Sequence, residues 1–217
     1  GRELVQKLLA GTNIALITDA GTPGISDPGE ELVKMAYEAG IEVTSLPGAC
    51  ACVTALTLSG LSTRRFVFEA FLPPDKKEHK LALERLKNET RTMIVYEAPH
   101  HLLKTLRELL ETLGNRRLTL CRELTKKHET AWQTTIEDAI TRYEQEDPKG
   151  ECVLVIEGRS QKEIEDEAKA AFEEISIEEH MKRYEDQGIA RKEAMKLVAK
   201  DRGVTKRDIY QYLLGKE

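Results

Sequence analysis

Two loops rich in glycine and other small residues are the positions where this sequence could hold a ligand. The first, TDAGTPG at 18–24, follows an apolar run, and the second, LPGACA at 46–51, follows the next apolar run. Small residues let backbone amides approach a ligand closely, and α/β proteins bind ligands at the carboxyl ends of strands. The two loops together therefore predict the floor of a pocket. The alternatives are a long strand-to-helix connection for the first loop and tight helix–sheet packing for the second.

The first loop matches neither of the common phosphate-binding patterns. Gly21, Gly24 and Gly29 are not spaced as in the Gly-x-Gly-x-x-Gly of dinucleotide-binding folds, and no P-loop Gly-Lys-Ser/Thr follows. We expect a helix to begin directly after the loop, with Asp27 as its cap and Pro28 at its first position.

Apolar runs and amphipathic patterns alternate along the chain and define the elements that would position these loops. Such alternation is typical of an α/β fold with a largely parallel sheet. The segment 129–135 alternates like an edge or antiparallel strand, so the sheet nearer the C-terminus is expected to be mixed. The predicted strands are 14–18, 42–46, 66–71, 92–97, 117–121 and 152–158, and the predicted helices are 28–39, 49–59, 78–88, 98–113 and 136–146.

The Pro-rich, charged segment 72–80 is the predicted linker between two α/β domains, which would span 1–71 and 81–160. Residues 161–217 read as a helical module, in which a turn at Gly203 separates two helices like a helix-turn-helix. Its cations could contact an RNA backbone, or the module could be a solvated helical hairpin. These cations are Lys192, Lys196, Lys200, Arg202, Lys206 and Arg207.

Composition excludes several classes of protein. The chain has 217 residues, 40% hydrophobic and 33% charged, which is typical of a globular protein, and its net charge of −5 argues against a wholly basic nucleic-acid binder. No apolar run or signal peptide indicates a membrane protein, so we expect a cytoplasmic one. The four cysteines lie in apolar runs without CxxC or histidine spacing, which predicts buried thiols and no metal site.

Six blocks, in this order, carry a family resemblance. They are DAGTPGISDPG, LPGACA, FEAFLP, RTMIVYEAPHHL, RELTKKHE and GECVLVIEG. Together they resemble the tetrapyrrole methylase superfamily, and more closely its bacterial branch that 2'-O-methylates a cytidine of 16S ribosomal RNA. The resemblance implies two α/β domains with S-adenosylmethionine in the cleft between them, a homodimer and no metal. Members of this family begin earlier in the chain, with a strand and a loop that touches the donor. The chain is therefore expected to be part of a longer protein, and without that segment to show weak or no activity.

The resemblance also assigns candidate site residues. The donor would lie against the first loop, with the second loop covering it from another side, and four positions across the cleft would line the remainder. Where many family members carry Gly-Asp-Pro this chain reads Ala20-Gly21-Thr22, and Asp19 is the adjacent acid. The donor-binding set is Asp19, Ala20, Gly21, Thr22, Gly24, Cys50, Ala51, Tyr96, Glu97, Leu124 and Ile156.

A ribose hydroxyl is a poor nucleophile at neutral pH, so a general base is expected near the donor. Glu97 is our candidate, because it ends a buried-looking strand where burial could raise its proton affinity, although a helix-capping role is the alternative. Other candidates are His100, His101, Glu123 and Lys126. The loop that contains Lys126 and Lys127 is either solvated or contacts RNA phosphates. Lys206 and Arg207 are the corresponding candidates for RNA contact in the helical module.

The sequence thus predicts an S-adenosylmethionine-dependent rRNA 2'-O-methyltransferase that acts on the small ribosomal subunit. One alternative is a tetrapyrrole methyltransferase of the same fold, against which the basic helical module argues. The other is a non-catalytic RNA- or ribosome-binding protein.

Overall fold

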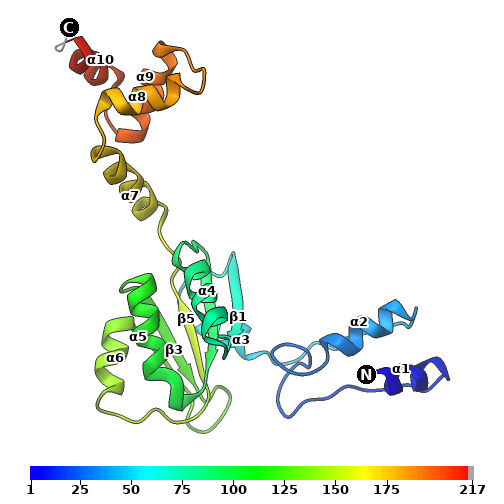
Figure 1. Ribbon diagram of the computed structural model, residues 1–217. Helices are drawn as coiled ribbons and strands as arrows, with labels where there is room; N and C mark the ends of the chain where they lie inside the picture. The colour runs from blue at the N-terminus through cyan, green and yellow to red at the C-terminus, as the bar shows by residue number, and fades with distance from the viewer. Residues whose placement is uncertain (215–217) are drawn as a thin grey trace. The chain divides into compact units, whose positions relative to one another are not determined.

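A five-stranded mixed sheet forms the centre of the first of two units in the computed structural model (Figure 1). The first unit spans 1–158 and the second 159–217, and residues 1–214 are described, apart from the side chains of 168 and 173. The strand order is β1-β2-β5-β3-β4. The strands are β1 (Phe66–Phe71), β2 (Thr92–Glu97), β3 (Arg117–Arg122), β4 (Thr130–Thr135) and β5 (Cys152–Ile156).

The directions of the strands correct one expectation. Only β1 and β2 pair in parallel, whereas β5 is antiparallel to both β2 and β3, and β3 is antiparallel to β4. A largely parallel sheet is therefore wrong for this unit, because β5 inserts between β2 and β3 with the opposite direction. The expectation of an antiparallel edge strand at 129–135 is confirmed by β4.

Helices cover both faces of the sheet, because alternate residues of each strand point to opposite sides. On one face, Met93 and Val95 of β2 join a core with α4 (Lys76–Lys87), α5 (Leu102–Leu113) and α6 (Ile136–Tyr143). On the other face, Ile94 packs against α3 (Ala51–Leu58). Each fully buried leucine or isoleucine contributes about 1.5–3 kcal/mol to such cores. Both faces are therefore held in place, and so is the N-terminus of α3.

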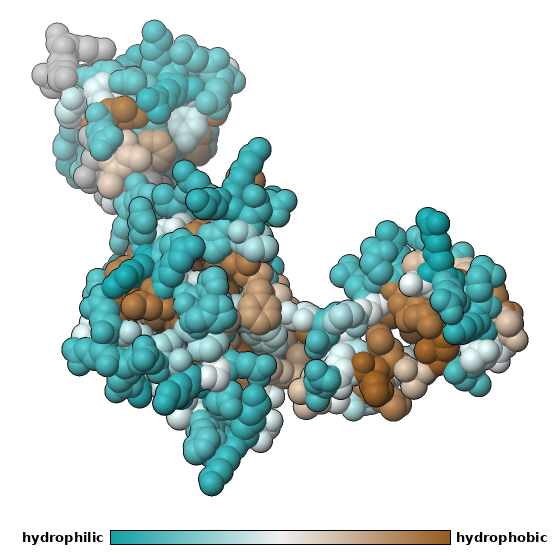
Figure 2. Space-filling view, turned by 60° about the horizontal axis from the view of Figure 1, so that its bottom comes forward, coloured by the Kyte–Doolittle hydropathy of each residue, from teal (hydrophilic) through white to brown (hydrophobic). Residues whose placement is uncertain are grey.

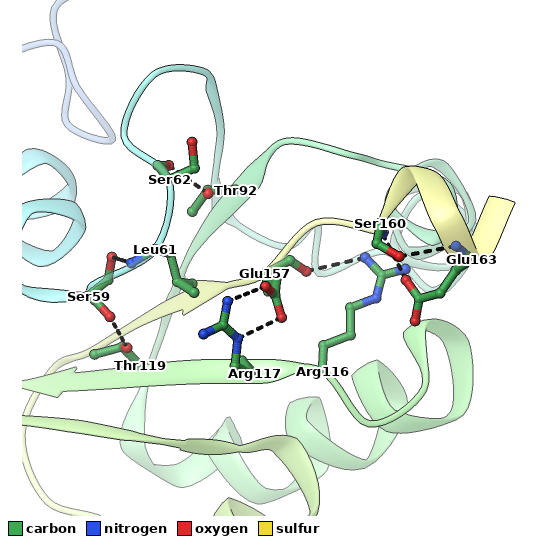
Figure 3. Close-up of polar contacts among 10 residues, drawn as sticks. All are labelled: Ser59, Leu61, Ser62, Thr92, Arg116, Arg117, Thr119, Glu157, Ser160 and Glu163. Atoms are coloured by element: carbon green, nitrogen blue, oxygen red, sulfur yellow. Dashed lines mark hydrogen bonds and ion pairs between the residues drawn. The ribbon is translucent and has the colours of Figure 1, made fainter. Parts of the chain in front are cut away.

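A short segment between α3 and β1 fastens α3 to the sheet (Figure 3). Thr119 of β3 donates its hydroxyl to the carbonyl oxygen of Ser59 at 2.9 Å, and Thr92 of β2 donates to that of Ser62 at 2.7 Å. The Ser59 hydroxyl in turn accepts the amide of Leu61 at 3.0 Å. The C-terminal end of α3 and the segment that follows it are thus tied to the interior strands β2 and β3.

The predicted strands at 14–18 and 42–46 are wrong for the described chain. Neither segment pairs with a strand there, and Ile17 and Leu46 are 83% and 84% exposed. Apolar residues specify a strand only when a neighbouring strand satisfies the backbone. Other exposed apolar side chains within or near these segments include Leu9, Leu16 and Ile25. Figure 2 shows patches of hydrophobic surface, in brown, on the first unit.

The helix after the first loop begins later than predicted. α1 (Arg2–Leu9) precedes the loop, and α2 (Glu30–Glu38) follows it with Gly29 as its cap residue. Asp27 therefore does not cap this helix. Gly29 has a φ of 152°, a backbone conformation that residues with a side chain rarely adopt, and a Cβ there would lie 2.6 Å from Leu16 Cδ2.

The predicted linker at 72–80 connects two elements of the sheet unit. β1 pairs with β2, and Leu72 is buried in the same core as α4. Asp75 caps α4 by accepting the amides of Lys77 and Glu78, both at 3.0 Å. Two separate domains at 1–71 and 81–160 stay a prediction, and the structure places β1 in one sheet with the strands of the second.

The second unit consists of helices, and it begins at Arg159, close to the predicted start of the helical module. Its helices are α7 (Gln161–Glu173), α8 (Ile177–Glu185), α9 (Arg191–Arg202) and α10 (Lys206–Leu214). Gly203, with a left-handed φ of 66°, ends α9, and Thr205 and Asp208 cap α10 reciprocally. The predicted helix-turn-helix is therefore present. Within the described range, no helix combines the length and apolar character that crossing a membrane requires.

A buried polar network holds α8 against α9. His180 is 1% exposed and stacks on Phe172, with ring centroids 4.2 Å apart. Its Nε2 lies 3.3 Å from Asp201 Oδ2, and Arg202 Nε donates to its Nδ1 at 3.3 Å. Tyr184 donates its hydroxyl to the same Asp201 oxygen at 2.6 Å. Arg202 is therefore engaged inside the module, which corrects its assignment to the surface that would contact RNA.

This network predicts a pH-dependent stability of the helical module. Burial and the neighbouring Arg202 guanidinium lower the pKa of His180 from its ordinary 6.5. The unfolded chain then binds the proton first, so the contribution of His180 is complete above pH 6.5 and is lost as pH falls below it. The melting temperature, measured by circular dichroism, should be higher for the native chain than for a His180→Gln variant at pH 7.5. That difference should shrink as the pH falls to 5.5. A constant difference would contradict this assignment.

Candidate active site

The carboxyl ends of three strands meet at one edge of the sheet. β1 and β2 run in the same direction, and β3 matches them because both β2 and β3 are antiparallel to β5. In the register, Glu97 of β2 and Arg122 of β3 both face Cys152 of β5. The loops after the three strands, around 72–75, 98–101 and 123–129, therefore follow this edge, which we call the carboxyl edge.

The two small-residue loops lie in contact. Thr22 donates both its amide and its hydroxyl to the carbonyl oxygen of Ala49, at 2.9 and 3.1 Å. Gly21 has a φ of +83°, and a Cβ built on it would lie 2.8 Å from the same oxygen. Glycine is thus required at 21 both by conformation and by space. The two loops expected to form a pocket floor are therefore in contact; a pocket at this junction stays a prediction.

The second loop continues into a partly buried wall on the α3 face of the carboxyl edge. Cys50 caps the start of α3, and its Sγ lies 3.3 Å from that of Cys52. Tyr96 and Leu124, at the ends of β2 and β3, pack on the same cluster. We call Cys50, Tyr96, Leu124, Phe68 and Phe71 the edge wall.

The aromatic part of the edge wall depends on a β-bulge that sequence reasoning missed. The register of β1 shifts between Phe68 and Ala70, where Ala70 has a φ of 54°. Without the bulge, Phe68 and Phe71 would point to opposite faces; with it, both contact the Tyr96 ring edge-on, at centroid distances of 5.0 and 5.7 Å. Burial, with the nearby Cys52 and Cys50, raises the pKa of Tyr96. Tyr96 therefore serves as a neutral phenol.

Comparison with known proteins identifies the family. The family model described as Tetrapyrrole (Corrin/Porphyrin) Methylases matches residues 1–140. The chain belongs to the tetrapyrrole methylase family. It is 45% identical over 217 residues to a Synechocystis protein named Ribosomal RNA small subunit methyltransferase I, and covers 76% of it. A protein of the same name from Halalkalibacterium halodurans is 47% identical over 97% of this chain and 72% of its own length.

A solved structure supports the fold. The methyltransferase CobJ superimposes with a TM-score of 0.54 over 72% of this chain and 69% of that chain, at 19% identity. The α/β architecture expected from the resemblance is therefore shown.

Two of the donor-binding positions assigned by the family resemblance point away from the edge wall. Ile156 is fully buried in the core on the opposite face of the sheet, together with α4–α6, so its side chain cannot line the wall. The neighbouring Val155 lies on the wall's face. A shift of one residue in a strand reverses the direction of the side chain, and a donor contact at Ile156 stays a prediction.

Glu97 also points to the α5 face. Its Oε1 accepts the amide of Ala98 at 2.8 Å, and its Oε2 accepts the Thr105 hydroxyl of α5 at 2.6 Å. Both oxygens thus anchor the start of the helix that follows β2. This geometry favours the capping alternative, and a catalytic role for Glu97 stays a prediction.

The remaining candidates lie in loops or at the starts of helices. Asp19, Ala20 and Ala51 are exposed, and Gly24 has a φ of 79°. Lys126 is paired with Glu123 at 3.2 Å and Glu151 at 3.0 Å. By contrast, the structure gives Lys127 no ion pair in its described part. Lys206 and Arg207 begin α10. Their contacts with a ligand stay predictions.

Proposed function

We propose that this chain transfers a methyl group from S-adenosylmethionine to the 2'-hydroxyl of a cytidine ribose in the 16S RNA of the small ribosomal subunit. The observation that carries the proposal is its 44–47% identity, over 97–100% of the chain, to three relatives named Ribosomal RNA small subunit methyltransferase I. We further propose a cytoplasmic homodimer. The basic helix-turn-helix is the feature that favours RNA over a tetrapyrrole as substrate.

The loop junction fits a donor held by backbone atoms. Because Gly21 has no Cβ, the backbone of the first loop can approach Ala49 closely. We assign donor contacts to the first loop (Asp19, Ala20, Gly21, Thr22 and Gly24), to Cys50 and Ala51, and to Tyr96 and Leu124 of the edge wall. When bound, S-adenosylmethionine supplies a methyl group on a sulfonium, which is already activated. The protein's task is therefore to align the ribose hydroxyl, and positioning of this kind contributes about 7–11 kcal/mol.

The direct test is methylation of unmodified small ribosomal subunits, with the modified nucleotide mapped by mass spectrometry. We expect one 2'-O-methylcytidine that depends on added donor. Methylation of a corrin or porphyrin precursor instead would favour the tetrapyrrole alternative. If calorimetry showed no donor binding, the non-catalytic alternative would stand.

The four cysteines provide a chemical test of the donor site. Burial raises the pKa of Cys52, Cys121 and Cys152 to about 11, so these thiols are protonated and shielded at pH 8. Cys50 is only partly buried. We expect iodoacetamide to modify Cys50 first, and S-adenosylmethionine to slow that modification at least several-fold, as read by peptide mass spectrometry. Equal rates at Cys50 with and without donor would remove it from the donor site.

Two cations at the start of α10 test the RNA contact of the helical module. Reversing both charges, Lys206→Glu with Arg207→Glu, should weaken binding to subunits. The slope of log binding constant against log salt concentration should become shallower by about 1–2. The matched control reverses the adjacent pair Lys182 and Arg183 at the end of α8. Equal losses in both double variants would show a general charge effect rather than a contact by α10.

A further inference from the structure

An arginine at the carboxyl edge forms no ion pair within the described residues. Arg122 is the last residue of β3, and its Nε is enclosed without a hydrogen bond. Across the part of the chain that the structure describes, its side chain forms no ion pair. A guanidinium stays charged at every accessible pH, and an enclosed N–H without an acceptor is costly. An unpaired arginine in such a place calls for an acceptor from outside the chain.

The nearest carboxylates are already engaged. The charges of Arg122, Glu97 and Glu123 all influence the pKa of the Cys152 thiol, so the four groups are neighbours. The oxygens of Glu97 accept from Ala98 and Thr105. Glu123 accepts the amide of Glu151 at 3.1 Å and the ammonium of Lys126 at 3.2 Å. Neither carboxylate lies within ion-pair distance of Arg122, because the oxygens of both accept hydrogen bonds from other groups.

The arginine at the opposite end of the same strand is paired with a carboxylate. Arg117, the first residue of β3, forms a two-pronged ion pair with Glu157 (Figure 3). Within the described residues, β3 therefore carries one ion-paired arginine far from the carboxyl edge and one arginine without an ion pair at that edge.

We propose that Arg122 binds a phosphodiester of the RNA substrate, an inference that rests on the proposed function. The planar guanidinium fork fits two phosphate oxygens. A target ribose is flanked by phosphodiesters, so a contact to one of them fixes the ribose at the carboxyl edge. The donor's carboxylate is the other anion available. It fits less well, because Arg122 shares the α5 face with Glu97, whereas the edge wall lies on the α3 face.

The test compares Arg122→Met, Arg122→Lys and the matched control Arg117→Met in methylation of unmodified small subunits. For Arg122→Met we expect KM for subunits to rise about tenfold or more and the salt slope of binding to fall by about 0.7–0.9. Arg122→Lys should be intermediate, since it keeps the charge and loses the fork. Arg117→Met should stay within about twofold of the native chain.

Two further readouts separate a contact from a structural role. Donor affinity by calorimetry should be unchanged in Arg122→Met, and its stability in urea should equal or exceed that of the native protein, because an unpaired enclosed donor is removed. Unchanged KM and salt slope would overturn the inference, as would weakened donor binding with normal KM, or a clear loss of stability. If the native protein methylates subunits, each of these results leaves the proposed function standing. Failure of the native protein would instead count against that function.

Discussion

Replacing Gly158 by alanine is expected to destabilise the sheet unit by about 3 kcal/mol or more, a large part of a typical domain's stability. Gly158 follows β5, and a Cβ there would lie 2.5 Å from the carbonyl oxygen of Arg91 and closer still to the carbonyl of Thr90. Both obstacles are backbone atoms just before β2, so no side-chain rotation can relieve the clash. Relief requires β2 and β5 to separate at the end of their pairing, where Met93 faces Ile156.

Trp132 on β4 makes this measurement specific to the sheet unit, because it is the only tryptophan in the chain. Urea unfolding followed by its fluorescence gives the free energy for native and variant protein. Gly114→Ala is the matched control: its φ is +76°, but an added Cβ meets no described atom within 4 Å. This control should cost only about 1 kcal/mol, from conformation alone. A Gly158→Ala variant no less stable than the control would contradict the close approach.

The sequence predicts elements here better than it predicts their pairing. The runs at 66–71 and 92–97 coincide with β1 and β2, because alternating or continuous apolar residues report local burial. The direction of β5 depends on which strands it meets, and no local pattern contains that information. The same holds for 14–18 and 42–46, whose apolar residues are as strand-like as those of β2 but have no strand partner within the described residues.

The candidate site shows the same division between local and non-local information. Small residues at 20–24 and 49–51 indicated a close approach of backbone, and the contact of Thr22 with Ala49 agrees with that. The Phe68–Tyr96–Phe71 cluster was missed, because it exists only through a bulge that shifts the register by one residue. The side chain of Ile156 faces away from the edge wall for a related reason, since a shift of one residue in a strand exchanges its two faces. The aromatic content of FVFEAF was the one available signal.

Arg122 and Arg202 show why charge in a sequence is a poor guide to function until partners are known. Both occur in basic, polar stretches. Arg202 donates to the carbonyl oxygens of Ile175 and Ser176 and to His180, so it stabilises the helical module. Arg122 has no such partner in the described chain. A cation with protein partners contributes to folding, whereas one held without them is available for a ligand.

Replacing Gly21 by alanine is expected to weaken S-adenosylmethionine binding by tenfold to a hundredfold with little loss of global stability. The added Cβ would lie 2.8 Å from the carbonyl oxygen of Ala49, and the φ of +83° disfavours any side chain. The first loop must then move away from Ala49, which breaks both hydrogen bonds of Thr22. Losing one or two hydrogen bonds to the donor costs about 1–3 kcal/mol, which corresponds to a tenfold to hundredfold loss of affinity. Since the first loop contributes no residue to the sheet cores, folding of β1–β5 should persist.

Calorimetric titration of donor into the Gly21→Ala protein measures this loss, and Gly40→Ala is its matched control. Gly40 has a similar φ of +70° after α2, but an added Cβ there meets no described atom within 4 Å. The control carries the same conformational cost without the collision, so its donor affinity should stay within about twofold of native. If both variants lost affinity equally, the effect would come from loop strain in general. If neither lost affinity, the junction of Gly21 with Ala49 would not be part of the donor site, and the donor contacts assigned to Ala20, Thr22 and Cys50 would fall with it.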